Sequence, residues 1–150
     1  MLQRPRILLY KFLFVVARIY WRIFSPRSHS VICLIECNDK ILLVRNTYGD
    51  MKWVFPGGGC KFGENPEKSA QREVMEEVGI AVKQLQKFGV YTESILNKNA
   101  VVHCFYSSIQ NPNLDIDTNE IYEGDWFNWT ELPYPLSLDT ERIIKMYRSQ

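Results

Sequence analysis

Residues 57–80 read GGGCKFGENPEKSAQREVMEEVGI, and the interpretation of the whole chain starts from this stretch. Its three leading glycines predict a tight, non-helical backbone that can approach another group closely. Pro66 to Val78 predicts a helix, because Asn65 can cap the first turn, proline suits that turn and Gly79 can end the helix. The stretch is therefore expected to be a glycine loop followed by a capped helix.

Three carboxylates crowd one face of that predicted helix, since Glu73, Glu76 and Glu77 lie at i, i+3 and i+4. Like charges at this spacing destabilise a helix by about a few tenths of a kcal/mol per pair. Their oxygens suit magnesium or manganese, and magnesium also accepts substrate phosphates as ligands. Alone, such a run is also typical of a solvated helix face. Its coupling to the glycine loop favours a cradle for a metal and a pyrophosphate, with Gly58 and Gly59 close to the substrate.

The spacing of this stretch resembles the Nudix box, a motif of a hydrolase family. Gly58 is followed after five residues by Glu64, and after seven more by the run REVMEEVGI from Arg72 to Ile80. The resemblance extends upstream through Leu42–Arg45 and Trp53–Gly57, and downstream through Trp126–Phe127 and Glu131–Pro133. It implies an α/β fold, an α/β/α sandwich around a mixed β-sheet.

The resemblance also implies a divalent metal, Mg²⁺ with Mn²⁺ as a possible substitute. The metal ligands would be the carboxylates of Glu73, Glu76 and Glu77 and the carbonyl of Gly57. Arg72 and Glu64 would orient those carboxylates, a role whose loss usually weakens metal binding.

The resemblance also implies a further acidic ligand or base near the late tryptophan, which points to Asp125 and Glu123, with Glu120 as another candidate. All three could instead lie in a solvent-facing acidic loop. The sequence does not name the general base.

The body of the chain alternates β-prone runs with helices, which predicts an α/β domain over residues 29–150. Ser30–Cys37 and Lys40–Arg45 predict strands joined by a turn at Asn38–Asp39. Other strands are expected at 53–56, 88–95, 101–108 and 125–129, a loop at 111–119 and a closing helix at 138–148.

Residues 1–28 form a separate region with six basic and no acidic residues. Arg4, Lys11, Arg18 and Arg22 recur along one stripe of an expected amphipathic helix. Its longest apolar run, Phe12–Ala17, is too short to span a membrane. The helix is expected either to lie on an anionic membrane or to dock on protein, including a homodimer partner.

Hydrophobic residues make up 46% and charged residues 23%, which is typical of a single globular domain. The four cysteines lack the density of a disulfide scaffold and the paired spacing of a zinc site. Reduced thiols and a cytoplasmic location are expected, with peripheral membrane contact as an open alternative.

These patterns predict a Mg²⁺-dependent hydrolase that cleaves a pyrophosphate linkage in a nucleoside diphosphate-type small molecule, such as a nucleoside triphosphate or a nucleotide sugar. No nucleic-acid partner is expected. The alternatives are a membrane-associated hydrolase of a lipid-linked or isoprenoid diphosphate and a non-catalytic ligand sensor. Several aromatic residues could stack a nucleobase, although core packing is the more common role. They are Tyr48, Phe88, Tyr91, Phe105, Tyr122 and Trp126.

Overall fold

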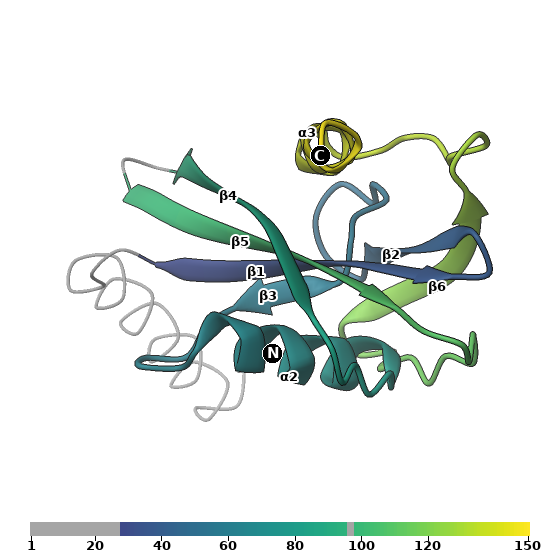
Figure 1. Ribbon diagram of the computed structural model, residues 1–150, viewed down its shortest axis with the longest axis horizontal. Coiled ribbons are helices and arrows are strands. Elements are labelled where there is room, and N and C mark those ends of the chain that lie inside the picture. Colours follow the sequence, from purple (N-terminus) through teal and green to yellow (C-terminus); the bar gives the residue numbers. More distant parts are fainter. Residues whose placement is uncertain (1–27, 96–97) are drawn as a thin grey trace, which may run out of the picture.

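The computed structural model describes residues 28–95 and 98–150, and Figure 1 shows their arrangement. The expected amino-terminal amphipathic helix falls within residues 1–27, outside these ranges, so that prediction is not tested. Within the described ranges, no helix is both long enough and apolar enough to cross a bilayer.

Six strands form one mixed sheet with the order β4-β5-β1-β2-β6, and β3 pairs with β1 off this path. Strands β1 and β5 run parallel, whereas the other pairs run antiparallel. The strands are β1 (His29–Cys37), β2 (Lys40–Asn46), β3 (Gly57–Gly59), β4 (Gln86–Ile95), β5 (Lys98–Ser108) and β6 (Ile121–Asn128).

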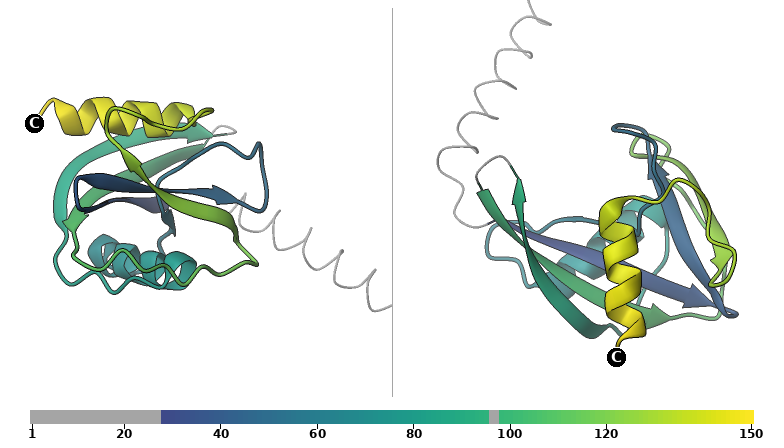
Figure 2. Two further views of the ribbon diagram at one scale, coloured as in Figure 1. Left: turned by 90° about the vertical axis from the view of Figure 1, so that its right-hand side faces the viewer. Right: turned by 90° about the horizontal axis from the view of Figure 1, so that it is seen from above.

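Two helices cover opposite faces of this sheet, α2 (Pro66–Val78) on one and α3 (Leu138–Arg148) on the other (Figures 1 and 2). The alternation of β1 supplies both cores, because successive side chains of a strand point to opposite faces. Val31 and Cys33 pack in the cluster under α2, while Leu34 packs in the cluster under α3. This arrangement confirms the predicted α/β/α sandwich.

The hairpin turn and the closing helix form where the sequence predicts them. Asn38 and Asp39 have φ values of 51° and 62°, as the central residues of a tight hairpin turn require. The Ser137 Oγ accepts a hydrogen bond from the Thr140 N–H at 3.1 Å and so caps α3.

Several strand predictions were wrong in extent. Strand β4 begins at Gln86 and β5 at Lys98, both earlier than expected, and two larger differences lie elsewhere. The strand expected at 125–129 is β6 and begins at Ile121, because Ile121–Gly124 pair with the end of β2 across a register shift. Residues 53–56 form only isolated bridges, Val54 to Val44 and Trp53 to Leu136. In both places, pairing with a distant segment decides the backbone, and the local sequence does not encode that pairing.

Candidate active site

The helix after the glycine loop is α2, and both of its ends form as its sequence indicates. The Asn65 Oδ1 accepts a hydrogen bond from the Glu67 N–H at 2.8 Å. Gly79 has φ 71°, and its N–H donates to the Met75 carbonyl at 3.1 Å. A Cβ at Gly79 would lie 2.5 Å from the Asp115 Cβ, so glycine supplies both the conformation and the space.

Three carboxylates lie along the flank of α2, on a gradient from solvent to core. The Glu76 side chain is 56% exposed and that of Glu73 only 12%. Glu77 is buried. The structure therefore brings the three predicted metal ligands onto one face of one helix.

Arg72 connects this face to the glycine loop through its guanidinium group. Its Nε and Nη2 donate to the two carboxylate oxygens of Glu64 at 3.0 and 2.9 Å. Its Nη1 donates to Glu73 at 2.6 Å and to Glu76 at 3.1 Å, and Nη2 also donates to the Gly59 carbonyl at 3.1 Å. These five hydrogen bonds match the five N–H donors of a guanidinium, so Arg72 and Glu64 lie where an orienting role needs them.

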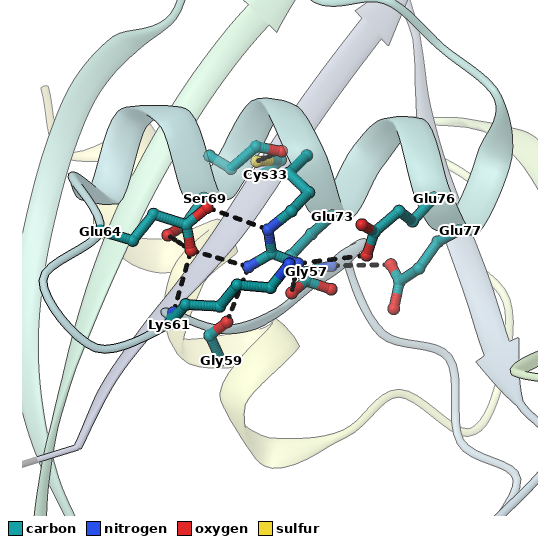
Figure 3. A network of polar contacts seen from close by, with 11 residues as sticks. Cys33, Gly57, Gly59, Lys61, Glu64, Ser69, Glu73, Glu76 and Glu77 are labelled. Atoms are coloured by element: carbon teal, nitrogen blue, oxygen red, sulfur yellow. Dashed lines mark hydrogen bonds and ion pairs between the residues drawn. The ribbon is translucent and has the colours of Figure 1, made fainter.

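Glu64 is itself fixed by two further donors that the sequence analysis missed. The Ser69 Oγ donates to it at 2.6 Å and the Lys61 N–H at 2.9 Å (Figure 3). The guanidinium of Arg72, then these two donors, hold the pKa of Glu64 well below its usual range. Ser69 precedes Arg72 by three residues, a same-face spacing that is visible in the sequence.

Glu77 is the buried carboxyl of the site. Its Oε2 accepts a hydrogen bond from the Gly57 N–H at 2.9 Å. Burial raises the pKa of Glu77 to about 8, and the charges of Glu73, Glu120 and Glu76 also raise it, against the opposing effect of the Gly57 N–H. A nearby cation would favour the charged form, because opposite charge lowers a carboxyl pKa.

The glycine run forms strand β3 and makes room for protein groups. A Cβ at Gly58 would lie 2.5 Å from a carboxylate oxygen of Glu73. A Cβ at Gly57 would overlap the Val31 carbonyl of β1. Only Gly59 has open space where a Cβ would lie. The first two glycines are thus explained by strand pairing and by Glu73, and phosphate binding by Gly58 and Gly59 stays a prediction.

Residues 115–120 run along the carboxyl end of α2. The Asp115 N–H donates to the Val78 carbonyl at 2.9 Å, and the Asp117 N–H donates to the Glu77 carbonyl at 3.1 Å. These bonds satisfy carbonyls that have no partner inside the helix. The same segment carries Glu120, whose charge acts on Glu77.

Glu123 and Asp125 lie on β6 and face away from α2. Their register partners on β2 are Arg45 and Leu43, and Leu43 packs in the cluster under α3. Glu123 forms an ion pair with Arg45 at 3.0 Å, while the exposed Asp125 accepts a hydrogen bond from the Trp126 N–H at 2.7 Å. The structure does not bring these two acids to the α2 carboxylates, whereas it does bring Glu120 near them.

The NUDIX domain profile matches residues 26–149, which is most of the chain. The chain belongs to the Nudix family. The geometry around α2 is therefore that of its Nudix box, and the mixed sheet between two helices is its Nudix fold.

Relatives of known activity cover only part of the molecule. An NAD-capped RNA hydrolase, NudC, from Escherichia coli O9:H4 (strain HS) is 30% identical over 113 residues, 75% of this chain and 43% of the relative. Diphosphoinositol polyphosphate phosphohydrolase 3-alpha from Mus musculus is 34% identical over 71 residues, 47% of this chain and 43% of the relative. The chain thus spans less than half the length of the curated relatives it matches.

The crystal structure of a MutT NUDIX hydrolase from Burkholderia pseudomallei has the same fold. It superposes with a TM-score of 0.73 at 20% sequence identity, covering 81% of this chain and 98% of that one.

Nudix hydrolases generally use divalent metals such as Mg²⁺. Across residues 28–95 and 98–150, no three His, Cys, Asp or Glu side chains converge on a ready-made metal position. In the site, the guanidinium of Arg72 donates hydrogen bonds to both Glu73 and Glu76. The hard oxygen donors fit a divalent ion once the exposed Glu76 turns from Arg72, and the cation would favour the charged form of Glu77.

Proposed function

We propose that the protein is a Mg²⁺-dependent pyrophosphohydrolase that cleaves a pyrophosphate linkage in a nucleotide-type small molecule. The observation that carries the proposal is the buried Glu77 beside Glu73 and Glu76, an acidic cluster that one guanidinium neutralises only in part. The relatives support the chemistry as well. NAD contains a pyrophosphate linkage, and a diphosphoinositol carries a diphosphate group.

Glu73, Glu76 and Glu77 would hold the metal, with the Gly57 carbonyl as a further candidate ligand. A bound divalent ion neutralises phosphate charge and lowers the pKa of an attacking water. Glu77 would be the buried ligand, held in place by the Gly57 N–H at 2.9 Å, and the cation would favour its charged form.

Proton transfer requires a carboxylate that is not fully engaged by the protein. Glu64 accepts hydrogen bonds from Arg72, Ser69 and Lys61, so it serves to aim Arg72 and not to take a proton. Glu120 and Glu76 are the candidates for the base that receives the proton of the attacking water.

The direct test is a screen of nucleoside triphosphates, nucleotide sugars, ADP-ribose and dinucleoside polyphosphates, with product analysis that identifies the broken bond. We expect hydrolysis that requires Mg²⁺, is supported by Mn²⁺ and stops when a chelator is added. A chain that binds these compounds and hydrolyses none of them would instead be a ligand sensor. The presence of all three box carboxylates argues against that alternative.

A lipid-linked or isoprenoid diphosphate is the second candidate substrate, motivated by the six basic residues of the first 28. Its test is sedimentation with anionic vesicles, comparing the full chain with a chain that lacks residues 1–24. Vesicle binding that depends on residues 1–24 would support a peripheral membrane location. A full chain that stays in solution would exclude this candidate and favour a cytoplasmic location.

A further inference from the structure

The loop between β2 and the glycine strand, residues 47–56, carries Tyr48, one of the aromatic residues that could stack on a base. Its base is closed by two hydrogen bonds, from the Val44 N–H to the Val54 carbonyl at 2.8 Å and from the Val54 N–H to the Val44 carbonyl at 2.9 Å. The loop therefore leaves the sheet and returns to it at one fixed position.

The same loop is tied sideways to the segment that borders α2. The Thr47 N–H donates to the Glu120 carbonyl at 2.8 Å, and the Thr47 Oγ1 donates to the Asn119 carbonyl at 2.9 Å. That segment is joined to the helix through the bond from Asp117 to Glu77. A chain of hydrogen bonds thus fixes Thr47, and with it the next residue, beside the end of α2 that carries Glu77.

The next residue is Tyr48, whose side chain is 64% exposed. The charges of Glu77, Glu120 and Glu73 add to the effect of partial burial in raising the pKa of its hydroxyl, so the ring lies within their electrostatic reach. Among the described residues, no aromatic ring or guanidinium stacks on Tyr48. Its flat apolar surface is open to solvent next to the site.

The other aromatic candidates from the sequence, apart from Tyr122, are engaged in packing. Phe105 lies in the core under α2, and Trp126 packs against that core and donates its Nε1–H to the Pro112 carbonyl at 2.9 Å. Phe88 and Tyr91 pack against the core under α3. Tyr122, on β6, is 62% exposed and is the rival of Tyr48.

We propose that Tyr48 stacks on the nucleobase of the substrate, so that the site selects diphosphates that carry a planar heterocycle. This inference rests on the proposed function, because the diphosphate must lie at the α2 carboxylates for its nucleoside to reach the loop. Aromatic rings bind bases through their faces and tolerate different bases. Tyr48 therefore acts as a specificity-determining residue for the class of substrate, without choosing one base.

The test measures dissociation constants of the full chain for two non-hydrolysable ligands, α,β-methylene-ADP and methylenediphosphonate, which share the bridge and differ in the nucleoside. We expect Tyr48→Ala to raise the dissociation constant of α,β-methylene-ADP about tenfold or more. The dissociation constant of methylenediphosphonate should change by less than about twofold. Tyr48→Phe keeps the ring and is expected to bind the nucleotide analogue within about threefold of the wild-type chain.

Two matched variants complete the test. Tyr134→Ala removes a 91% exposed tyrosine from the segment that pairs with Trp53 on the α3 side, and it is expected to leave both constants unchanged. Tyr122→Ala tests the rival ring. The proposal is overturned if the binding of the nucleotide analogue is weakened by Tyr122→Ala and not by Tyr48→Ala. It is also overturned if Tyr48→Ala weakens the binding of both ligands equally.

Failure of this inference is distinguishable from failure of the proposed function. If the chain hydrolyses base-free diphosphates and the binding of nucleotide analogues is independent of Tyr48, stacking is wrong and the hydrolase function stands. If the chain binds nucleotide analogues through Tyr48 but hydrolyses no diphosphate, stacking stands and the hydrolase function is wrong. Failure of the methylene analogues of all four common nucleoside diphosphates to bind the wild-type chain overturns stacking.

Discussion

Helices α2 and α3 cover the two faces of one sheet, yet they differ in the charges of their last turns. Helix α3 has Asp139 and Glu141 in its first turn and Lys145 and Arg148 in its last, as the helix dipole favours. Helix α2 has no basic residue in its last turn and instead carries acidic Glu76 and Glu77 there.

The difference separates a helix built for packing from one built for binding. The carboxyl end of a helix carries a partial negative charge of about half an electron, so the acids of α2 oppose their own helix. Arg72 offsets part of this repulsion, and a divalent cation would offset the remainder. Each experiment below changes one residue of α2 or its cap. Three of them use a matched change in α3 or at its end as the control, and the Glu77 experiment compares the variant with the unchanged protein.

The largest effect is expected from Glu76→Gln, which keeps the side-chain shape and removes one carboxylate from the cluster. We expect kcat to fall about 10²–10³-fold, since a charge that acts on the reacting phosphates is lost. The fold should persist, because the change relieves like-charge repulsion. Glu141→Gln in the exposed first turn of α3 is the control and should change kcat by less than about twofold. A pure Glu76→Gln enzyme that hydrolyses at the parent rate in saturating Mg²⁺ would show that the site is elsewhere.

Arg72→Lys tests whether the guanidinium orients the metal-binding carboxylates. An ammonium group cannot reproduce the forked bonds to Glu64 together with those to Glu73, so the carboxylates lose their fixed positions. The Mg²⁺ concentration for half-maximal activity should rise about 10- to 100-fold. Arg142→Lys on α3, whose partner Asp139 lies 3.4 Å away at the surface, should leave it unchanged. Equal effects of the two variants would contradict an orienting role.

The buried Glu77 predicts a pH dependence of stability in the metal-free protein. Its pKa in the folded chain is about 8, above the ordinary value of 4.5 that it regains on unfolding. Between these values the folded chain binds more protons than the unfolded chain, so stability falls as pH rises through this window. The loss is on the order of 2 kcal/mol between about pH 6 and pH 8.

Urea denaturation in the presence of a chelator measures this loss. Glu77→Gln should flatten the decline in stability, because it removes the titrating group. The fold should persist, because the amide oxygen can still accept the hydrogen bond from the Gly57 N–H. A decline that is equally steep in both proteins would assign the effect to another group.

The last comparison concerns the ends of the two helices. Gly79→Ala forces a side chain into a left-handed backbone and toward Asp115, and we expect it to lower the free energy of unfolding by about 1–3 kcal/mol. Ser149→Ala at the end of α3, where φ is −91°, should cost less than about 0.5 kcal/mol. Denaturant titrations compare the two, and equal losses would mean that the Asp115 contact adds nothing.

Part of the site could be predicted because its signals are local. Asn65, Pro66 and Gly79 fix the ends of α2, and the spacing of Glu73, Glu76 and Glu77 fixes their common face. These features depend on interactions within a few residues, so they do not require knowledge of how distant segments pair.

The choice among Asp125, Glu123 and Glu120 could not be made from the sequence, because the side of the sheet that an acid faces depends on a strand register. Asp125 and Glu123 precede the late tryptophan as expected, but the pairing of β6 with β2 turns them to the α3 face. Glu120, in the segment before the strand, lies near Glu77 instead. A one-residue change in register moves a side chain to the other face of a sheet, and a bulge has the same effect locally.

The sequence by itself determined the Nudix box and the capped helix α2, since both follow from local spacing, and the resemblance that the box carries implied the α/β/α architecture. Only the tertiary structure decided that Glu77 is buried with a raised pKa, that Gly58 makes room for Glu73, and that Tyr48 is exposed and within the electrostatic reach of Glu77. Burial and proximity arise where segments distant in the sequence meet, and those meetings depend on the packing of the whole domain.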